Sequence, residues 1–223
     1  MNSKEVNCVQ GSADWFKARC GKPTASRFDC IITELGKAAK NKAKADYFYE
    51  LIAERLTLQS AQHFTTAAME RGTLLEPEAR KWYAAATNRD VRQVGFIDAG
   101  RWGCSPDGLC ADRGVEIKCP MTVNMVRLLL AEDAEAAADY QLQCQAGMWI
   151  AGLPFWDLVL YSGQAGLPNR IITLNVDAKL HEAFAQHVPA FCAEVDAAEG
   201  KLRAAGGGYT MRDQYAELTG EEK

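Results

Sequence analysis

The chain has 223 residues, of which 48% are hydrophobic and 24% are charged, and its formal net charge is −4. This length and composition predict one globular domain with its own core, and no apolar run is long enough for a transmembrane helix. The first residues lack the apolar stretch of a signal peptide, so we expect a cytoplasmic protein without membrane contact. The acidic total argues against indiscriminate nucleic-acid binding, but residues 17–55 hold nine Lys/Arg against five acids, enough to receive a polyanion on one face.

Helical periodicity, N-caps and glycine stops dominate the first part of the chain, and a period of two follows. The expected helices lie at 11–21, 24–33, 46–56, 66–87, 133–151 and 179–202. The expected strands lie at 91–97, 102–104, 108–111, 115–118, 155–161 and 171–176. This order predicts a single α/β domain over 1–223, with a central mixed sheet flanked by helices. We expect residues 1–10, the lysine-rich loop at 36–45 and the end at 205–223 to be flexible.

A D…ExK pattern stands near the middle of the chain, where CSPDG at 104–108 precedes GVEIKCP at 114–120. Side chains alternate along a strand, so Glu116 and Lys118 are expected on one face and Ile117 in the core. A turn at 112–114 would bring Asp107 back beside them. Two carboxylates can hold Mg²⁺, and a lysine can orient or activate a water. The pattern therefore predicts metal-dependent phosphodiester hydrolysis, although Asp107 alone could be a turn residue and the ExK pair a surface ion pair.

The cysteines stand at 8, 20, 30, 104, 110, 119, 144 and 192, with no CxxC spacing. This spacing speaks against a zinc ribbon, and only two cysteines follow the D…ExK segment, too few for an iron–sulfur cluster. We expect reduced and mostly buried thiols.

Five short motifs occur in a fixed order along the chain: Trp15-x3-Arg19-x4-Thr24-Ala25-Ser26, Gly72-x3-Glu76-x2-Ala79, CSPDG at 104–108, EIKCP at 116–120 and Gln143-x-Gln145-x2-Met148-Trp149. In this combination the chain resembles the lambda-type phage alkaline exonucleases, the YqaJ-type viral recombinase family. The resemblance implies a restriction-endonuclease-like (PD-(D/E)XK) core and a phage or prophage gene in a bacterial host.

The resemblance also implies a function. Members degrade one strand of linear double-stranded DNA processively from its 5′ end, prefer 5′-phosphorylated ends and leave 3′ single strands. It implies two Mg²⁺ ions in each active site, with Mn²⁺ as a substitute. It further implies a homotrimer ring around the DNA and a single-strand annealing protein as partner in homologous recombination.

Carried over by position, the resemblance assigns metal ligands to Asp107, Glu116, Glu76 and the backbone carbonyl of Ile117. Lys118 would orient or deprotonate the attacking water. Gln145 would be the helix glutamine near the site, with Gln143 as a second candidate.

The resemblance assigns Arg19, Ser26 and Ser105 to binding of the terminal 5′ phosphate. Met69 stands seven residues before Glu76, where the family uses an apolar wedge to split the terminal base pair. The lysines at 37–44 would reach the duplex.

Three other functions compete with this interpretation. An endonuclease on the same fold would share the metal site but would not need a pocket for a terminal phosphate. A non-catalytic module that binds DNA ends is disfavoured because the acids and the lysine are all present. A small-phosphoester hydrolase is disfavoured by the lysine-rich segment and by the family motifs.

Overall fold

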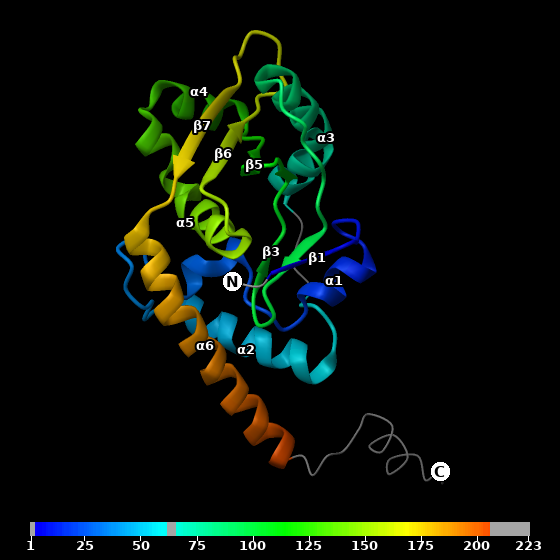
Figure 1. Ribbon diagram of the computed structural model, residues 1–223, viewed down its shortest axis with the longest axis vertical. Coiled ribbons are helices and arrows are strands. Elements are labelled where there is room, and N and C mark those ends of the chain that lie inside the picture. The colour runs from blue at the N-terminus through cyan, green and yellow to red at the C-terminus, as the bar shows by residue number, and fades with distance from the viewer. Residues whose placement is uncertain (1–2, 62–65, 206–223) are drawn as a thin grey trace.

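The computed structural model describes residues 3–61 and 66–205, and Figure 1 shows their arrangement. The helices are α1 (Ala13–Arg19), the short 3-10 helix η1 (Ala25–Cys30), α2 (Lys42–Thr57), α3 (Ala67–Thr87), α4 (Thr122–Leu130), α5 (Asp133–Ala151) and α6 (Ala178–Ala205). The strands are β1 (Lys4–Val6), β2 (Phe96–Asp98), β3 (Gly103–Cys104), β4 (Gly108–Leu109), β5 (Arg113–Lys118), β6 (Phe155–Leu160) and β7 (Arg170–Asn175). The end that was expected to be flexible lies, from residue 206 on, outside the described residues.

The strands form two sheets rather than the single sheet expected from the sequence. A three-stranded sheet has the order β1-β2-β3, and a four-stranded sheet has the order β4-β5-β6-β7. In the second sheet β5 and β6 are parallel, whereas β4–β5 and β6–β7 are antiparallel. The predicted α/β class with mixed strand pairing and flanking helices is confirmed.

Helices cover both faces of the four-stranded sheet, because its central strands alternate two sets of apolar side chains. Trp156, Leu158 and Leu160 of β6 pack with α4 and α5 on one face. Val159 and Tyr161 pack with α3 on the other face. In Figure 1, α3 and α4 accordingly lie on opposite sides of β5, β6 and β7.

Two glycines let α5 approach the sheet closely. A Cβ at Gly114 would lie 2.2 Å from the ring of Trp156, and a Cβ at Gly147 would lie 2.6 Å from the same ring. Real Cβ atoms do not approach other atoms so closely, so any side chain there would push the helix away from β5. The packing of α5 on Trp156 thus sets how near its polar residues come to the end of β5.

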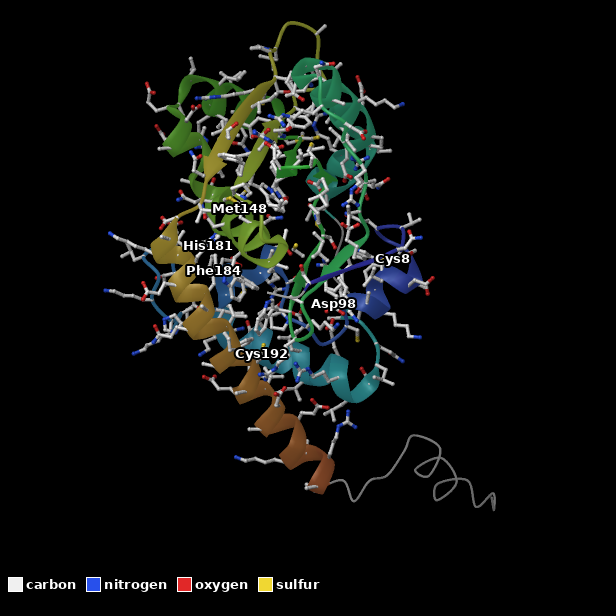
Figure 2. All side chains as sticks on the ribbon, in the orientation of Figure 1. Cys8, Asp98, Met148, His181, Phe184 and Cys192 are labelled. Atoms are coloured by element: carbon white, nitrogen blue, oxygen red, sulfur yellow. The ribbon has the colours of Figure 1, made fainter. Side chains whose placement is uncertain are left out.

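A second core lies between η1, α2, α5 and α6. The rings of Phe28 and Phe184 meet edge to face, with centroids 5.4 Å apart, and Phe191 stacks on Tyr47. Phe184 and Cys192 of α6 belong to this core and are labelled in Figure 2. Among the described residues, no helix is long and apolar enough to cross a membrane.

The structure corrects several boundaries. The expected helix at 24–33 is the shorter 3-10 helix η1, and α2 begins inside the expected lysine-rich loop because the side chain of Asn41 caps it, accepting from the Lys44 N–H at 3.0 Å. The expected strand at 91–97 is reduced to β2 and an isolated bridge between Arg92 and Leu109. The strand β1 and the helix α4 were not predicted.

All eight cysteines are free, and five of them are buried, in line with the expected thiols.

Candidate active site

The candidate site is built on the open edge of β5. Strand β4 is short and pairs only with Gly114 and Val115, so the second half of β5 has a neighbour on the β6 side alone. The free edge beside Glu116 and Lys118 leaves room for groups from elsewhere in the chain. Asp107 from the β3–β4 turn and Glu76 from α3 lie there.

Asp107 is fixed to this edge by backbone hydrogen bonds. Its N–H donates to the carbonyl of Val115 at 3.0 Å, and its carboxylate accepts from the N–H of Ile117 at 2.7 Å. The N–H and the C=O of one residue point to the same side of a strand, so the carbonyl of Ile117 also faces Asp107. This orientation is compatible with the predicted ligand role of that carbonyl.

Glu116 and Lys118 share the face of β5 that lies under α5, as the alternation predicted. The Lys118 Nζ lies 2.7 Å from the Glu116 Oε1, and Ile117 is buried against α3 on the opposite face. The amide of Gln143 joins the pair, because it donates to Glu116 at 2.6 Å and accepts from Lys118 at 3.2 Å. The ring of Tyr140, one turn earlier on α5, lies 5.3 Å from the lysine nitrogen.

The predicted role of Gln145 is corrected by this geometry. Its amide donates to the carbonyl of Asn175 at 2.7 Å and accepts from the N–H of Asp177 at 2.9 Å. Residues two apart on a helix point in different directions, so Gln143 and Gln145 cannot share a site. Gln145 therefore ties α5 to the end of β7, and Gln143 is the glutamine at the carboxylates.

Glu76 reaches the site from α3 and is held by a residue that the sequence interpretation missed. The guanidinium of Arg80, one turn later, pairs with the carboxylate of Glu76 and also donates through Nε to the carbonyl of Asp107 at 2.6 Å. The i, i+4 spacing of Glu76 and Arg80 is a visible sequence signal. What it could not show is the second bond, to a turn far along the chain.

The carboxylates crowd one another. Burial raises the pKa of Asp107 well above its ordinary value, and the charges of Glu116 and Glu76 raise it further. Burial also raises the pKa of Glu76, against the opposing charge of Arg80. For Lys118, burial lowers the pKa, but the Glu116 and Asp107 carboxylates outweigh it, and the net shift is upward. The upward pKa shifts of Asp107, Glu76 and Lys118 show that negative charge is in excess in this cluster, and a divalent cation would neutralise that excess.

The oxygen ligands suit a hard cation such as Mg²⁺, but they are not gathered around a common centre. Within 3–61 and 66–205, no three His, Cys, Asp or Glu side chains stand close enough to hold a metal ion as they are. Each predicted ligand is instead engaged by a group of the protein: Glu76 by Arg80, Glu116 by Lys118 and Gln143, and Asp107 by a backbone N–H. The donor set therefore fits Mg²⁺ chemically, and its side chains would have to turn to bind one.

A cavity of about 490 Å³ opens over these residues. Glu76, Asp107, Glu116 and Lys118 line it together with Met69, which lies in the first turn of α3 and is 52% exposed. The predicted wedge residue thus lies at the same opening as the predicted metal ligands.

The three predicted phosphate-binding residues gather on the other side of Glu116. Arg19 donates to the hydroxyl of Ser105 at 3.0 Å and to Thr24 at 3.4 Å, and Thr24 lies 3.4 Å from Ser26. The indole of Trp15, which the sequence interpretation used only as a motif position, also donates to Ser105 at 2.8 Å and stacks on the guanidinium. No Asp or Glu of the described chain forms an ion pair with Arg19, although burial lowers its pKa.

A small cavity of about 20 Å³ lies between this group and Glu116, and Arg19, Ser26, Ser105, Glu116 and Gln143 line it. Its volume is close to that of one water molecule. A phosphate would therefore bind at its mouth, where Ser26 is exposed.

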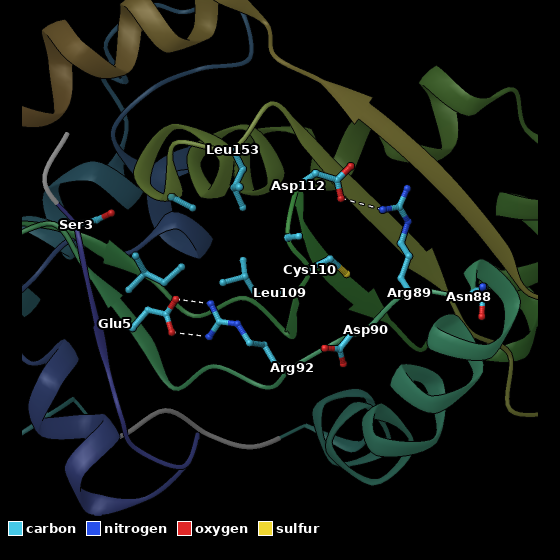
Figure 3. A pocket seen from close by; sticks show the side chains of 13 residues that line it. Ser3, Glu5, Asn88, Arg89, Asp90, Arg92, Leu109, Cys110, Asp112 and Leu153 are labelled. Carbon is cyan, nitrogen blue, oxygen red and sulfur yellow. Dashed lines mark hydrogen bonds and ion pairs between the residues drawn. The ribbon is translucent and has the colours of Figure 1, made fainter.

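A different cavity, of about 670 Å³, lies by β1 and the β4–β5 turn (Figure 3). Its arginines are already paired, Arg92 with Glu5 and Arg89 with Asp112. None of the predicted site residues lines it. It is not a candidate for the catalytic centre.

Comparisons with known proteins show the family of this chain. A family model for the YqaJ-like viral recombinase domain matches residues 14–154. The chain is 32% identical to an alkaline exonuclease (LHK-Exo) from Laribacter hongkongensis, with a TM-score of 0.76 over 88% of this chain and 99% of that one. The structure of LHK-Exo in complex with dAMP matches at 33% identity, with the same TM-score and coverage. A phage-related exonuclease from Haemophilus somnus 129PT shares the fold at 17% identity, with a TM-score of 0.65 over 81% and 96% of the two chains. No curated protein sequence matches the chain significantly.

Fold and site together define an α/β enzyme homologous to an alkaline exonuclease over most of its length. The chain belongs to the YqaJ-like viral recombinase family, and the resemblance predicted from the five motifs is confirmed.

Proposed function

We propose that this protein is a Mg²⁺-dependent, processive 5′→3′ exonuclease on linear double-stranded DNA, built as a single nuclease domain with a PD-(D/E)XK core. The observation that carries the proposal is that Glu76, Asp107, Glu116 and Lys118 line one cavity. On the other side of Glu116 lies Arg19, which forms no ion pair with an Asp or Glu of the described residues. The homology to an alkaline exonuclease supports the same reaction.

The chain's own residues divide the work of hydrolysis. Asp107, Glu116, Glu76 and the carbonyl of Ile117 would hold Mg²⁺, which supplies charge stabilisation for the attacking and departing oxygens. The Lys118 ammonium, held between Glu116 and Gln143, orients the attacking water toward the scissile phosphate. Gln143 keeps the lysine and the carboxylate in register through its two hydrogen bonds.

End preference would come from the group around Arg19. The guanidinium of Arg19 has no carboxylate partner within residues 3–61 and 66–205 and stacks on Trp15, an arrangement that suits a terminal phosphate dianion. Ser105 already accepts from this arginine, and Ser26 is exposed beside it. A 5′ phosphate bound there would set how far the first phosphodiester lies from the metal ligands.

We propose four further parts of the function, which the resemblance to the family implies. Met69 at the rim would part the terminal base pair, and the exposed Lys37 and Lys40 would contact the duplex. The other two lysines of the segment lie in α2, where Lys42 pairs with Asp46 and Lys44 pairs with Glu194. A homotrimer ring would give processivity, and an annealing protein would take the 3′ strand during recombination.

The test of the reaction is digestion of two linear duplexes, one 5′-phosphorylated and one not, beside a closed circle, with Mg²⁺ and with EDTA. We expect metal-dependent loss of the phosphorylated linear DNA, with 3′ single strands left. Cutting of the circle would show an endonuclease, and absence of any cleavage would leave a DNA-end-binding module.

The test of the pocket is Arg19→Ala, with Arg19→Lys as the matched control that keeps the charge but not the fork. The alanine variant should lose about tenfold or more of its preference for phosphorylated ends. Equal losses of cleavage rate on phosphorylated and hydroxyl ends would contradict the assignment of the pocket.

The test of the ring is the mass of the protein in solution. Light scattering should give three times the mass of the 24.5 kDa chain if the ring forms.

A further inference from the structure

Arg80 has a position that the proposed reaction does not explain. Its side chain is 13% exposed, and its guanidinium reaches both Glu76 on its own helix and the backbone carbonyl of Asp107. The planar fork of arginine can serve two acceptors at once in a fixed geometry, which an ammonium cannot do. Arg80 thereby ties α3 to the β3–β4 turn, two segments that carry different predicted metal ligands.

The charges of the site explain why such a tie is needed. Glu76, Asp107 and Glu116 bring three carboxylates to one cavity, and Lys118 pairs with Glu116. Among the described residues, Arg80 is the cation paired with Glu76, and no other carboxylate lies within ion-pair distance of it. Without Arg80, Glu76 would have no ion-pair partner among the described residues until a metal arrived.

The same contact withholds Glu76 from a metal. The guanidinium of Arg80 occupies Oε1 of the carboxylate that would complete the ligand set, and its positive charge opposes the approach of a second cation to that carboxylate. A divalent ion and a guanidinium that share one carboxylate repel each other, so each weakens the binding of the other.

We propose that Arg80 is a positioning residue that acts as an internal counter-ion: it holds Glu76 in the metal-free protein and competes with the metal for that carboxylate. The inference rests on the proposed metal site. It assigns Arg80 two opposite effects, since the residue stabilises the metal-free fold and weakens metal binding. A residue with a merely structural role would strengthen both the stability of the metal-free fold and the binding of the metal, or it would affect neither.

The experiment uses the full chain, with Ca²⁺ as the probe and two variants. Arg80→Met keeps much of the length of the side chain without its charge, and Arg80→Lys keeps the charge without the fork. Ca²⁺ affinity is measured by calorimetry, and thermal unfolding is followed in EDTA and in Ca²⁺. We expect Arg80→Met to unfold at a lower temperature in EDTA, to bind Ca²⁺ roughly five- to tenfold more tightly and to gain more in unfolding temperature from Ca²⁺ than the wild type does. The unfolding temperature and the Ca²⁺ affinity of Arg80→Lys should lie between those of the wild type and those of Arg80→Met.

Each other outcome has a distinct meaning. If the wild type binds no Ca²⁺, the proposed metal site fails, and this inference fails with it. If the wild type binds Ca²⁺ but Arg80→Met binds it equally or more weakly, the metal site stands and the counter-ion role is overturned. Should Arg80→Met not fold, Arg80→Lys decides, because an affinity equal to or below that of the wild type would refute competition.

Discussion

Two polar clusters lie on the same sheet, one at its open edge and one in its interior, and they differ in how their charges are satisfied. In the interior, Asp157 of β6 accepts from Arg113 at 3.0 Å, from Thr173 at 2.7 Å and from the hydroxyl of Tyr83 at 2.5 Å. This network joins β5, β6, β7 and α3 around one carboxylate. The edge cluster instead holds Glu76, Asp107 and Glu116 together, and the pKa values of Asp107 and Glu76 are raised.

The difference teaches that buried charge alone does not identify a functional site. Asp157 is more buried than Asp107, yet every one of its partners donates to it, so its cluster is complete within the chain. The edge cluster has more negative charge than the protein neutralises, and only a cation from outside would complete it. Excess charge beside a cavity, rather than burial, is what marks the edge cluster as the candidate active site.

The largest effect is expected on the rate of DNA digestion, when a predicted metal ligand of the edge cluster is removed. Asp107→Ala or Glu116→Ala should lower the rate of DNA digestion by roughly a thousandfold or more, since several kcal/mol of transition-state stabilisation depend on the metal. The fold should persist, because the edge cluster is not what holds the sheet together. Digestion of a phosphorylated linear duplex measures the rate, and circular dichroism checks the fold. Appreciable residual activity would refute the site.

A matched pair of substitutions tests the contrast between the clusters directly. Asp157→Asn should lower the free energy of unfolding by about 3 kcal/mol, because it leaves Arg113 with less opposing charge in the interior. Asp107→Asn should leave the metal-free stability unchanged or raise it, because it relieves repulsion while the amide oxygen can still accept from Ile117. Urea unfolding in EDTA measures both. Equal destabilisation by the two variants would mean that the clusters do not differ.

The two glutamines of α5 give a smaller but sharper test. Gln143→Ala should slow cleavage about tenfold, since it removes the group that orients Glu116 and Lys118, with little change in stability. Gln145→Ala should instead cost about 2 kcal/mol of stability, because it leaves buried backbone groups of the β7–α6 connection without partners, and it should change the cleavage rate little. A loss of activity in Gln145→Ala alone would restore the original assignment.

The smallest effect is a dependence of stability on pH. A carboxyl whose folded pKa is raised stabilises the fold fully below its ordinary pKa of about 4, and that contribution is lost as the pH rises through the raised value. In EDTA, the wild type should therefore lose stability relative to Asp107→Asn as the pH rises from about 4 toward neutrality. Saturating Ca²⁺ should reverse this difference near neutral pH, because Asp107→Asn has lost a charged ligand and gains less stability from the metal. A difference independent of pH would contradict the raised pKa of Asp107.

The sequence by itself indicated the family and much of the secondary structure. Alternation in β5 correctly put Glu116 and Lys118 on one face and Ile117 in the core, because the period of a strand is a local property of the backbone. Caps and periodicity likewise located α3, α5 and α6 to within a few residues. The order of five short motifs was enough to indicate the family, which the match over 14–154 confirms.

Only the tertiary structure decided which groups meet. In the sequence, Gln143 and Gln145 are both plausible as the glutamine near the carboxylates. Which of them faces Glu116 depends on how α5 packs on Trp156. The bond from Arg80 to the Asp107 carbonyl joins residues of α3 and the β3–β4 turn, and no local pattern encodes it. The division of the strands into two sheets also depends on long-range pairing, as of β1 with β2. Local periodicity fixes which way a side chain points, whereas its partners depend on how distant elements pack.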